Sequence, residues 1–449
     1  MLLVLLLLLS IAFIIFATAN LRMHPFLALL IAAFAFGILS GMPLADVVKS
    51  VNDGFGGTIG YIGIVILAGS IIGTFLERSG GAFRLAESIL KVTGERNVPA
   101  TMSIMGFVVS IPVFCDSGFV ILSSLNKALT RRAGITLATT AIALSLGLYA
   151  THTMVPPTPG PIAAAGILGA DLGLVILWGM LVAAIACFAG WVFAVTVAKR
   201  IYISPDDELP GEAAKSPTPV AAADSPGPVK SLLPILIPIV LIVIRSIAEF
   251  PTKPFGTETL YTILAFVGQP TVALLIGVAL ALLLPKKLER AMLADKGWVG
   301  EAILAAATII IITGAGGAFG KVLQNSGIAG VVGQTLADTR IGIILPFLIA
   351  AGIKTAQGSS TVAIITTAGL MAPLLASLGL DSDTAKALVV VAIGAGSMVV
   401  SHANDSFFWV VTQFSNMDAA TGYKLQTVGT LVEGLVAAVV VWVISIGVL

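Results

Sequence analysis

The stretch THTMVPPTPGP, residues 151–161, holds four prolines, a histidine and a glycine inside a strongly apolar part of the chain. Proline lacks the backbone N–H that an α-helix uses, and its ring clashes with the preceding turn. In a bilayer, freed backbone groups are tolerated only where they are buried in protein or line a water-filled cavity. This stretch therefore predicts a membrane helix that is broken inside the protein.

The composition extends this membrane assignment to the whole chain. Of 449 residues, 57% are hydrophobic and 10% are charged, whereas soluble domains carry about 25% charged residues. The net charge of +1 offers no basic surface for nucleic acid. Cys115 and Cys187 lie in apolar segments and indicate neither a disulfide nor a metal site. We expect an all-α polytopic membrane protein that has no cofactor. The sequence has no paired metal motif and no activated nucleophile, so we expect no enzymatic activity.

Apolar runs of about 20 residues have the length that crosses a bilayer, and the chain contains about ten of them. Two further apolar stretches, 99–129 and 343–380, are interrupted by polar residues and fit re-entrant hairpins with a polar tip inside the protein. The first run lacks the basic start and cleavage site of a signal peptide, so we expect it to remain as a span. The expected spans lie near 2–19, 25–42, 58–76, 137–155, 161–198 in part, 232–250, 259–284, 299–322, 385–403 and 429–448.

Basic residues indicate the orientation. Clusters of Lys and Arg lie at 78–96, 127–132, 199–200 and 286–296. If the N-terminus is outside and 99–129 is a hairpin, all four clusters fall in the cytoplasm, as the positive-inside rule requires. If 99–129 were a crossing, the second cluster would fall outside. We therefore expect both termini on the periplasmic or extracellular side of a bacterial inner membrane.

The chain repeats itself. LERSGGA at 76–82 resembles LQNSGIA at 323–329, and YATHT around His152 resembles VVSHA around His402. A Pro-, Ala- and Ser-rich stretch at 201–231 separates the copies, and this composition predicts a flexible cytoplasmic linker.

Two repeats, residues 1–200 and 232–449, follow from this pattern. Each contains one hairpin and one broken helix, and the breaks lie near 151–161 and 401–409. Five expected crossings precede the linker, so the second repeat is inverted. Inverted repeats with broken helices are typical of secondary transporters, which bind substrate near the bilayer midplane.

Ionisable residues inside the expected membrane region fall in four places. Asp116 lies at the first hairpin tip, His152 in the first break, Lys354 at the second tip, and His402 and Asp405 in the second break. Such residues cost at least about 2.5 kcal/mol in a bilayer, so each is a candidate functional residue. The repeat relates these places in pairs, and we expect them to meet at the centre. The candidate substrate-binding residues are Ser117, Gly118, Thr151, His152, Thr158, Lys354, Gln357, Gly358, Ser359, Ser360, Ser401, His402, Asn404, Asp405 and Ser406.

The expected roles follow from side-chain chemistry. Helix N-termini after the hairpin tips attract a carboxylate, and Lys354 supplies a positive charge. Asn404, Thr158 and Ser117 both donate and accept, which suits them to hydroxyl groups. The candidates for carrying a proton are Asp116, His152, His402 and Asp405.

Structural interpretations stand beside these roles. A histidine in a membrane can simply join two helices, and Lys354 can extend to an interface or pair with Asp116. The prolines can do no more than kink a helix. Glu77 and Glu433 lie near expected span ends and are interpreted as structural, and GAGGAFG at 314–320 indicates close helix packing.

With these residues described, the chain resembles the gluconate permease family of proton symporters over nearly its whole length. The resemblance implies proton-coupled uptake of small hydroxylated carboxylates, such as gluconate, glycerate or D-serine. It also implies kinship to carriers with inverted repeats and two hairpins that work as homodimers by an elevator motion. Cys115 and Ser117 flank Asp116 where the family pattern has other residues, and Phe407 replaces a common glycine; both predict a changed pocket. The segments that carry the resemblance are HPFLALLIAAFAFGILSGMPL, NDGFGGTIGYIGIVILAGSIIG, LERSGGAFRLAE, THTMVPPTPGPIAAAG, AQGSSTVAIITTAGLMAP and SHANDSFFW.

We therefore predict a secondary transporter that imports a small hydroxy-carboxylate, of the gluconate, glycerate, lactate or D-serine class, with protons. Its expected partners are the organic anion, protons, the lipid bilayer and a second copy of the chain. A sodium-coupled carboxylate symporter is the nearest alternative, because hydroxyl and carbonyl oxygens at the tips also suit Na⁺. An anion channel would show a continuous polar stripe along several helices, and the sequence shows interruptions instead.

Overall fold

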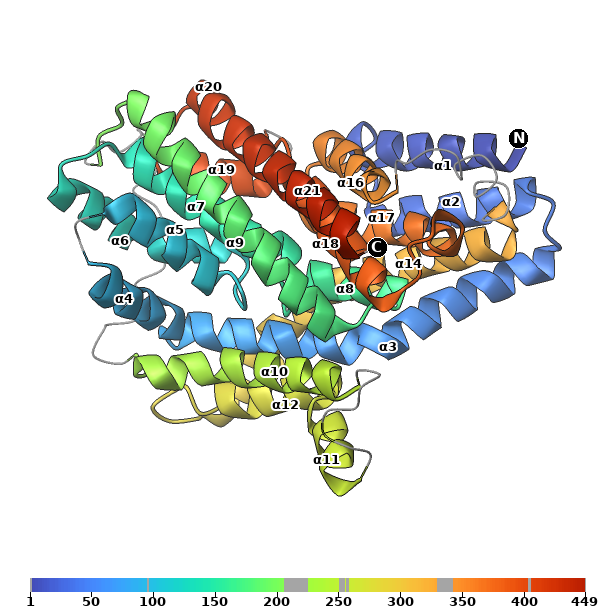
Figure 1. Ribbon diagram of the computed structural model, residues 1–449, viewed down its shortest axis with the longest axis horizontal. Helices are drawn as coiled ribbons and strands as arrows, with labels where there is room; N and C mark the ends of the chain where they lie inside the picture. Colours follow the sequence, from blue (N-terminus) through green and yellow to red (C-terminus); the bar gives the residue numbers. More distant parts are fainter. Residues whose placement is uncertain are drawn as a thin grey trace.

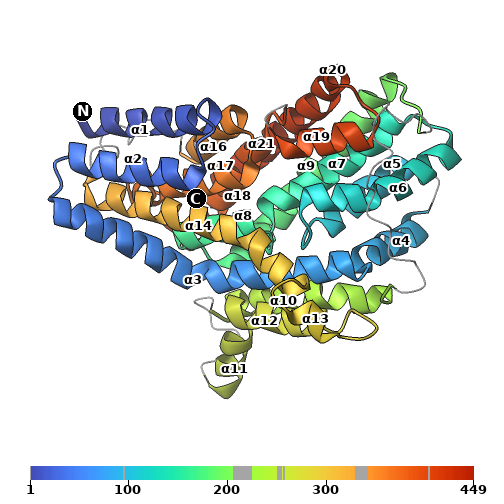
Figure 2. The same cartoon turned by 180° about the vertical axis from the view of Figure 1, so that it is seen from behind.

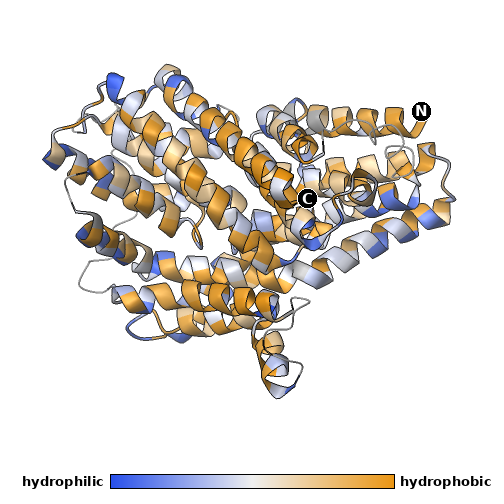
Figure 3. Ribbon diagram, viewed as in Figure 1, coloured by the Kyte–Doolittle hydropathy of each residue, from blue (hydrophilic) through white to orange (hydrophobic). Residues whose placement is uncertain are grey.

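The computed structural model describes residues 2–94, 97–205, 225–249, 255, 258–328, 342–402 and 405–448. Within these ranges the ordered elements are helices, and no strand occurs in them (Figure 1). This confirms the all-α prediction for that part of the chain. Apolar residues run along most of the helices, while polar residues gather mainly at helix ends and loops (Figure 3). The middle of the expected linker, 206–224, lies outside the described residues.

Four of the helices before the linker begin where the sequence supplies a capping side chain. The side chains of His24, Asn97, Thr136 and Asp171 each accept a hydrogen bond from a first-turn N–H. These helices are α1 (Leu2–Ala19), α2 (Pro25–Leu39), α3 (Leu44–Arg78), α4 (Gly81–Thr93), α5 (Val98–Val109), α6 (Cys115–Ala133), α7 (Leu137–Met154), α8 (Pro159–Leu168) and α9 (Leu172–Thr196).

The helices after the linker follow a similar order of long and short elements. A π-helical turn, η4 (Tyr423–Thr427), leads directly into the last helix. The α-helices are α10 (Pro228–Glu249), α11 (Thr259–Val267), α12 (Pro270–Ala281), α13 (Arg290–Leu293), α14 (Trp298–Asn325), α16 (Ile344–Gln357), α17 (Ser360–Met371), α18 (Asp383–Met398), α19 (Ser406–Phe414), α20 (Ala419–Gly422) and α21 (Val428–Val448).

Three expected spans have different bounds in the structure. The span expected at 58–76 is part of the 35-residue helix α3, because the more polar residues 44–57 contain no proline and continue the same helix. The span expected at 259–284 is a pair of helices, α11 and α12, bent by 64° where Pro270 starts the second. The run at 161–198 divides into α8 and α9, because Gly169 adopts a left-handed conformation with φ of 63° and ends α8.

Several helices are long enough to span a membrane. Among the described residues, four helices are long and apolar enough to cross a bilayer alone, and two bent pairs raise this to six. The four are Leu172–Arg200, Pro228–Ala248, Arg290–Asn325 and Ala419–Val448. Shorter apolar helices, including α1, α2, α5, α16 and α17, lie beside them.

Two central helices, α7 and α18, carry the breaks. Every residue of α7 is buried, and so are nearly all residues of α18. Helix α7 packs against α5, α6, α9 and α18, which keeps it away from the surface (Figures 1 and 2). Each central helix stops at an irregular segment, 155–158 after α7 and 399–402 after α18, and a short helix follows, α8 from Pro159 and α19 from Ser406. The proline-rich stretch therefore does break a buried helix.

Close packing of the long helices α3 and α14 forms one side of the molecule (Figure 2). A Cβ atom on Gly54 would lie 2.5 Å from the carbonyl oxygen of Gly317, so only glycine allows this approach of the two backbones. Gly317 belongs to the glycine-rich run at 314–320. The sequence pattern was therefore right to indicate close helix packing there.

Each short helix that follows a break packs against a helix from the opposite side of the linker. Helix α8 packs against α17, and α19 packs against α6. Because α6 and α17 each begin directly after a connection between two helices, this exchange brings both connections and both breaks to the same region.

Candidate functional site

A cavity of about 250 Å³ lies where the four polar interruptions meet. It is enclosed by the start of α6, one face of α7, the start of α17 and the start of α19. Its lining residues are Phe114, Cys115, Asp116, Tyr149, His152, Gly358, Ser359, Ser360, Thr361, Asp405, Ser406 and Phe407.

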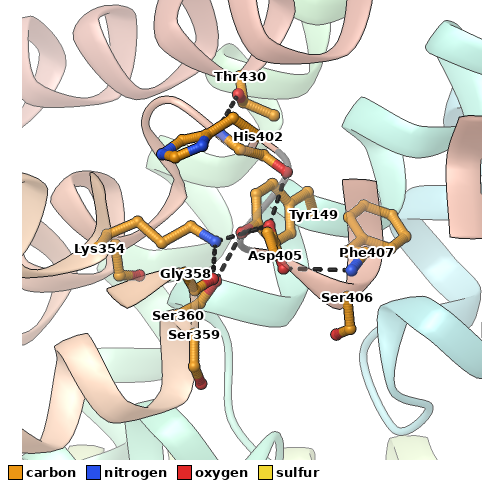
Figure 4. A network of polar contacts seen from close by, with 12 residues as sticks. Tyr149, Lys354, Gly358, Ser359, Ser360, His402, Asp405, Ser406, Phe407 and Thr430 are labelled. Atoms are coloured by element: carbon orange, nitrogen blue, oxygen red, sulfur yellow. Dashed lines mark hydrogen bonds and ion pairs between the residues drawn. The ribbon is translucent and has the colours of Figure 1, made fainter. Parts of the chain in front are cut away.

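A buried ion pair forms one wall of this region. The Lys354 ammonium lies 2.6 Å from Asp405 Oδ2, and the two side chains are 0% and 6% exposed (Figure 4). Lys354 also donates a hydrogen bond to the Gly358 carbonyl. Lys354 therefore neither reaches a membrane interface nor pairs with Asp116. Its charge is neutralised inside the protein.

Asp405 accepts several more hydrogen bonds. Its Oδ2 atom accepts from the Ser401 hydroxyl at 2.6 Å and from Tyr149 at 3.3 Å, and its Oδ1 atom accepts from the Phe407 N–H at 3.1 Å. These three hydrogen bonds and the Lys354 ammonium satisfy both oxygens of the Asp405 side chain. Asp405 is also the N-cap of α19, so this network holds the short helix in place (Figure 4).

The tip between α16 and α17 depends on local backbone geometry. Gly358 adopts a left-handed conformation with φ of 92°, which a residue with a Cβ adopts only at a cost. Ser359 follows as the N-cap of α17 and accepts from the Val362 N–H at 3.3 Å. The Ser360 hydroxyl lies 2.6 Å from the Tyr149 hydroxyl, which joins the tip to α7.

Asp116 has a different environment from Asp405. It lies in the first turn of α6, and its Oδ1 atom accepts from the Ser406 hydroxyl at 3.4 Å, a long hydrogen bond. The Cys115 thiol lies 4.0 Å from its other oxygen. Among the described residues no Lys, Arg or His forms an ion pair with Asp116. The cavity therefore has one neutralised carboxylate and one carboxyl group without a counter-ion.

The two histidines lie in different surroundings. His152 is 8% exposed and lines the cavity; its ring centroid is 5.8 Å from that of Phe114. Its Nδ1 atom has no hydrogen-bond partner among the described residues. His402 lies outside the cavity lining, and its Nε2 atom is 2.8 Å from the Thr355 carbonyl oxygen. Only one histidine therefore faces the enclosed space.

Several candidates from the sequence lie next to the cavity without lining it. The Thr158 hydroxyl donates to the Val155 carbonyl at 2.6 Å, and the Thr151 hydroxyl donates to the Leu148 carbonyl at 3.4 Å. Ser117 lies outside the cavity lining, close to Glu77. A Cβ on Gly118 would lie 2.7 Å from a Leu148 methyl group. The side chain of Gln357 and all of Asn404 lie outside the described residues.

Other lining residues were missed by sequence reasoning. Tyr149 lies three positions before His152 on α7, so helical spacing would have placed it on the same face. Phe114 and Thr361 lie within two positions of residues that the sequence did single out. Cys115 and Phe407, which the family resemblance indicated as residues that change the pocket, also belong to the lining. The described residues contain no group of three or more His, Cys, Asp or Glu side chains that could hold a metal ion.

Comparison with known proteins gives the family. The profile described as GntP family permease matches residues 1–447. The chain belongs to the GntP permease family. As a GntP permease it is a transporter and not an enzyme, and the resemblance drawn from its sequence motifs is confirmed.

Named relatives of this GntP permease cover almost all of it. A gluconate permease of Pseudomonas aeruginosa is 35% identical and covers 95% of this chain and 93% of its own. The high-affinity gluconate transporter of Escherichia coli is 33% identical, with 88% of each chain covered. The inner membrane permease YgbN of Escherichia coli is 32% identical, over 94% of this chain and 93% of its own.

The fold of this permease matches a solved transporter structure. The Alcanivorax borkumensis YdaH transporter superposes with a TM-score of 0.66 over 95% of this chain and 99% of its own. The sequences are only 15% identical, so the likeness concerns the fold alone. The permease family and the apolar helices together indicate a multi-pass membrane protein.

Proposed function

We propose that this GntP permease imports a small hydroxy-carboxylate of the gluconate type across a bacterial inner membrane by proton symport. The observation that carries the proposal is the cavity, in which three helix N-termini, hydroxyl groups and a carboxyl group without a counter-ion line one partly open space. The names of the relatives, gluconate permease and gluconate transporter, support the substrate class.

The cavity suits a small anion. A volume of about 250 Å³ corresponds to the liquid volume of roughly eight water molecules, enough for a sugar acid. The first turns of α6, α17 and α19 lie at its lining and place the positive ends of three helix dipoles there. In this proposal the substrate carboxylate lies against α17, and Ser359, Ser360 and Thr361 donate to it. The substrate hydroxyls face Ser406 and Tyr149.

Asp116 provides the coupling to protons. An ionised Asp116 beside a substrate carboxylate places two negative charges in one cavity, which is unfavourable where the dielectric constant is low. Protonation removes this repulsion and converts the carboxyl group into a donor. The proton and the anion therefore bind together. His152, in the same lining, is the second candidate in this proposal, whereas Asp405 already has a counter-ion.

Lys354 argues for protons over sodium. Its ammonium group lies between the Gly358 carbonyl and the Asp405 carboxylate, both of which are oxygen ligands of the kind that Na⁺ takes. A built-in cation in this position leaves that pair of oxygens occupied. For sodium to bind at this tip, it would have to displace the Lys354 ammonium group from these two oxygens.

The proposed topology is two inverted repeats with about ten crossings. The α5–α6 and α16–α17 pairs act as re-entrant hairpins, and the α7–α8 and α18–α19 pairs act as broken spans. Support comes from the equivalent packing of each half: α5 on α7 and α16 on α18, α7 on α9 and α18 on α21. We further propose that the protein is a homodimer that works by an elevator motion, as the family resemblance implies. In the proposed orientation both termini lie outside and the linker lies in the cytoplasm.

Exchange measurements in proteoliposomes test the proposal. Vesicles loaded with unlabelled gluconate are expected to take up labelled gluconate by counterflow, and an inside-alkaline pH gradient is expected to drive its accumulation. Glycerate, lactate and D-serine, tested as competitors, define the range of substrates. If none of the four exchanges, the substrate class is wrong. If a sodium gradient alone drives accumulation, the coupling ion is wrong.

A further inference from the structure

A fully buried carboxyl group lies outside the cavity. Glu433, on α21, is 0% exposed, and neither of its carboxyl oxygens has a hydrogen-bond partner among the described residues. Burial without a partner strongly disfavours an ionised carboxylate, because no water, donor or cation replaces its lost hydration. In this conformation Glu433 therefore carries a proton. The sequence pattern assigned it a structural role at a span end, but it lies within the last membrane helix.

The neighbours of Glu433 supply no countercharge. Helix α21 packs against α7, α9, α16, α18 and η4. On α9, the Cys187 thiol is the titratable group that faces Glu433, and a Cβ on Gly190 would lie 3.3 Å from its Oε1 atom. Among the described residues, none of the other titratable and charged groups on these elements forms a hydrogen bond or ion pair with Glu433; these groups are Tyr149, His152, Lys354, Asp383, Lys386, Tyr423 and Lys424.

Glu433 lies on a polar stripe that leads to the site. Gln426, Thr430 and Glu433 have the spacing of one helical face, and each is 0% exposed. The Thr430 hydroxyl accepts from the Ser401 N–H at 3.0 Å, and the Thr427 hydroxyl donates to the Ser401 carbonyl at 2.5 Å. Ser401 in turn donates to Asp405. One turn of helix therefore separates Glu433 from the hydrogen bonds that hold the Lys354–Asp405 pair.

We propose that Glu433 is a second proton-binding residue of this transporter, separate from the cavity and linked to it through Thr430, Thr427 and Ser401. This rests on the proposed proton symport. A proton held at Glu433 keeps α21 packed on α9. Release of this proton would place an uncompensated negative charge between α21 and α9. The packing of the two helices is therefore coupled to the protonation of Glu433. The residue therefore adds one proton to those carried with each substrate.

The steady-state accumulation of labelled gluconate counts the coupled protons. With the membrane potential clamped, each coupled proton multiplies the accumulation ratio by about tenfold per unit of pH gradient. Glu433→Gln keeps the shape of the protonated acid but cannot release a proton. We expect counterflow close to wild type in E433Q and an accumulation ratio about tenfold lower per pH unit. Cys187→Ala, which removes the facing thiol, is expected to accumulate gluconate like wild type.

The outcomes separate the two proposals. If wild-type protein shows no accumulation driven by a pH gradient, the proposed proton symport fails. If wild type and E433Q accumulate gluconate to the same ratio, the Glu433 inference is overturned. It is also overturned if the accumulation ratio of C187A falls by the same tenfold per pH unit. Should E433Q not fold, infrared spectra of protein labelled with ¹³C-glutamate, in a Glu77→Gln background, provide a direct test. A protonated glutamate carbonyl band that persists at neutral pH is expected, and its absence overturns the inference.

Discussion

At the scale of single residues, the site contains two aspartates with opposite electrostatic settings. Asp405 is held by Lys354 and by hydrogen bonds from Ser401, Tyr149 and Phe407. Asp116 has weaker contacts, a long hydrogen bond from Ser406 and the Cys115 thiol at 4.0 Å. The first arrangement keeps a charge fixed, and the second leaves a carboxyl group free to respond to a bound anion. The two residues therefore predict different results on substitution.

Removing the buried cation is expected to destabilise the protein. Lys354→Met leaves the Asp405 carboxylate buried without its countercharge, which costs about 3–5 kcal/mol. Thermal unfolding in detergent is expected to occur at a clearly lower temperature, and counterflow is expected to be lost. Lys386→Met is the matched control, because Lys386 pairs with an exposed Asp381 at 3.0 Å, and such surface pairs contribute about 0–1 kcal/mol. Equal unfolding temperatures for the two variants would contradict a structural role for the buried pair.

Neutralising Asp116 is expected to remove the pH dependence of substrate binding. In wild type, protonated Asp116 favours the bound anion, so the apparent affinity for gluconate should rise as pH falls. Asp116→Asn resembles the protonated form at every pH. We expect its affinity to be nearly independent of pH, its counterflow to persist, and accumulation driven by a pH gradient to decrease. Binding of labelled gluconate across a pH series measures this. A wild-type pH profile in D116N would assign the proton elsewhere.

At the scale of elements, the breaks in α7 and α18 and the connection between α16 and α17 shape the site. The break after α7 could be predicted because prolines at 156–161 remove backbone donors within an apolar run. The partner of Lys354 could not be predicted, since both Asp116 and Asp405 were available and only side-chain direction decides between them. Tyr149 was missed because it lies within an apolar helix. The extent of α3 was missed because its first turns are not apolar, although nothing in them stops a helix.

The tip at Gly358 is expected to tolerate no side chain. Its left-handed backbone, with φ of 92°, costs an L-residue roughly 1–2 kcal/mol. Gly358→Ala is therefore expected to shift the tip and the Lys354 hydrogen bond, which lowers counterflow while the protein remains folded. Gly352→Ala, on the same helix α16 with no atom within 4 Å of its Cβ position, is the control and is expected to be active. Full activity of G358A would show that the tip geometry does not matter for transport.

At the scale of the whole molecule, the inverted topology makes opposite predictions for two exposed positions. Leu44 at the start of α3 is 67% exposed and Tyr202 after α9 is 76% exposed. In protein whose Cys115 and Cys187 have been replaced, Leu44→Cys is expected to react with an impermeant maleimide from outside. Tyr202→Cys is expected to react only from the cytoplasmic side. Reaction of both from one side would contradict the proposed number of crossings between them.

The ammonium group of Lys354 is a counter-ion that cannot diffuse away. Because it is tethered to α16 beside the Gly358 carbonyl and the Asp405 carboxylate, its local concentration does not depend on the composition of the medium. A tip closed by a soluble ion loosens whenever that ion is scarce on one side of the membrane. A tip closed by a side chain keeps its shape in dilute and salty surroundings alike. In the proposed elevator cycle, the empty carrier would therefore return for its next substrate without first binding a cation at this tip.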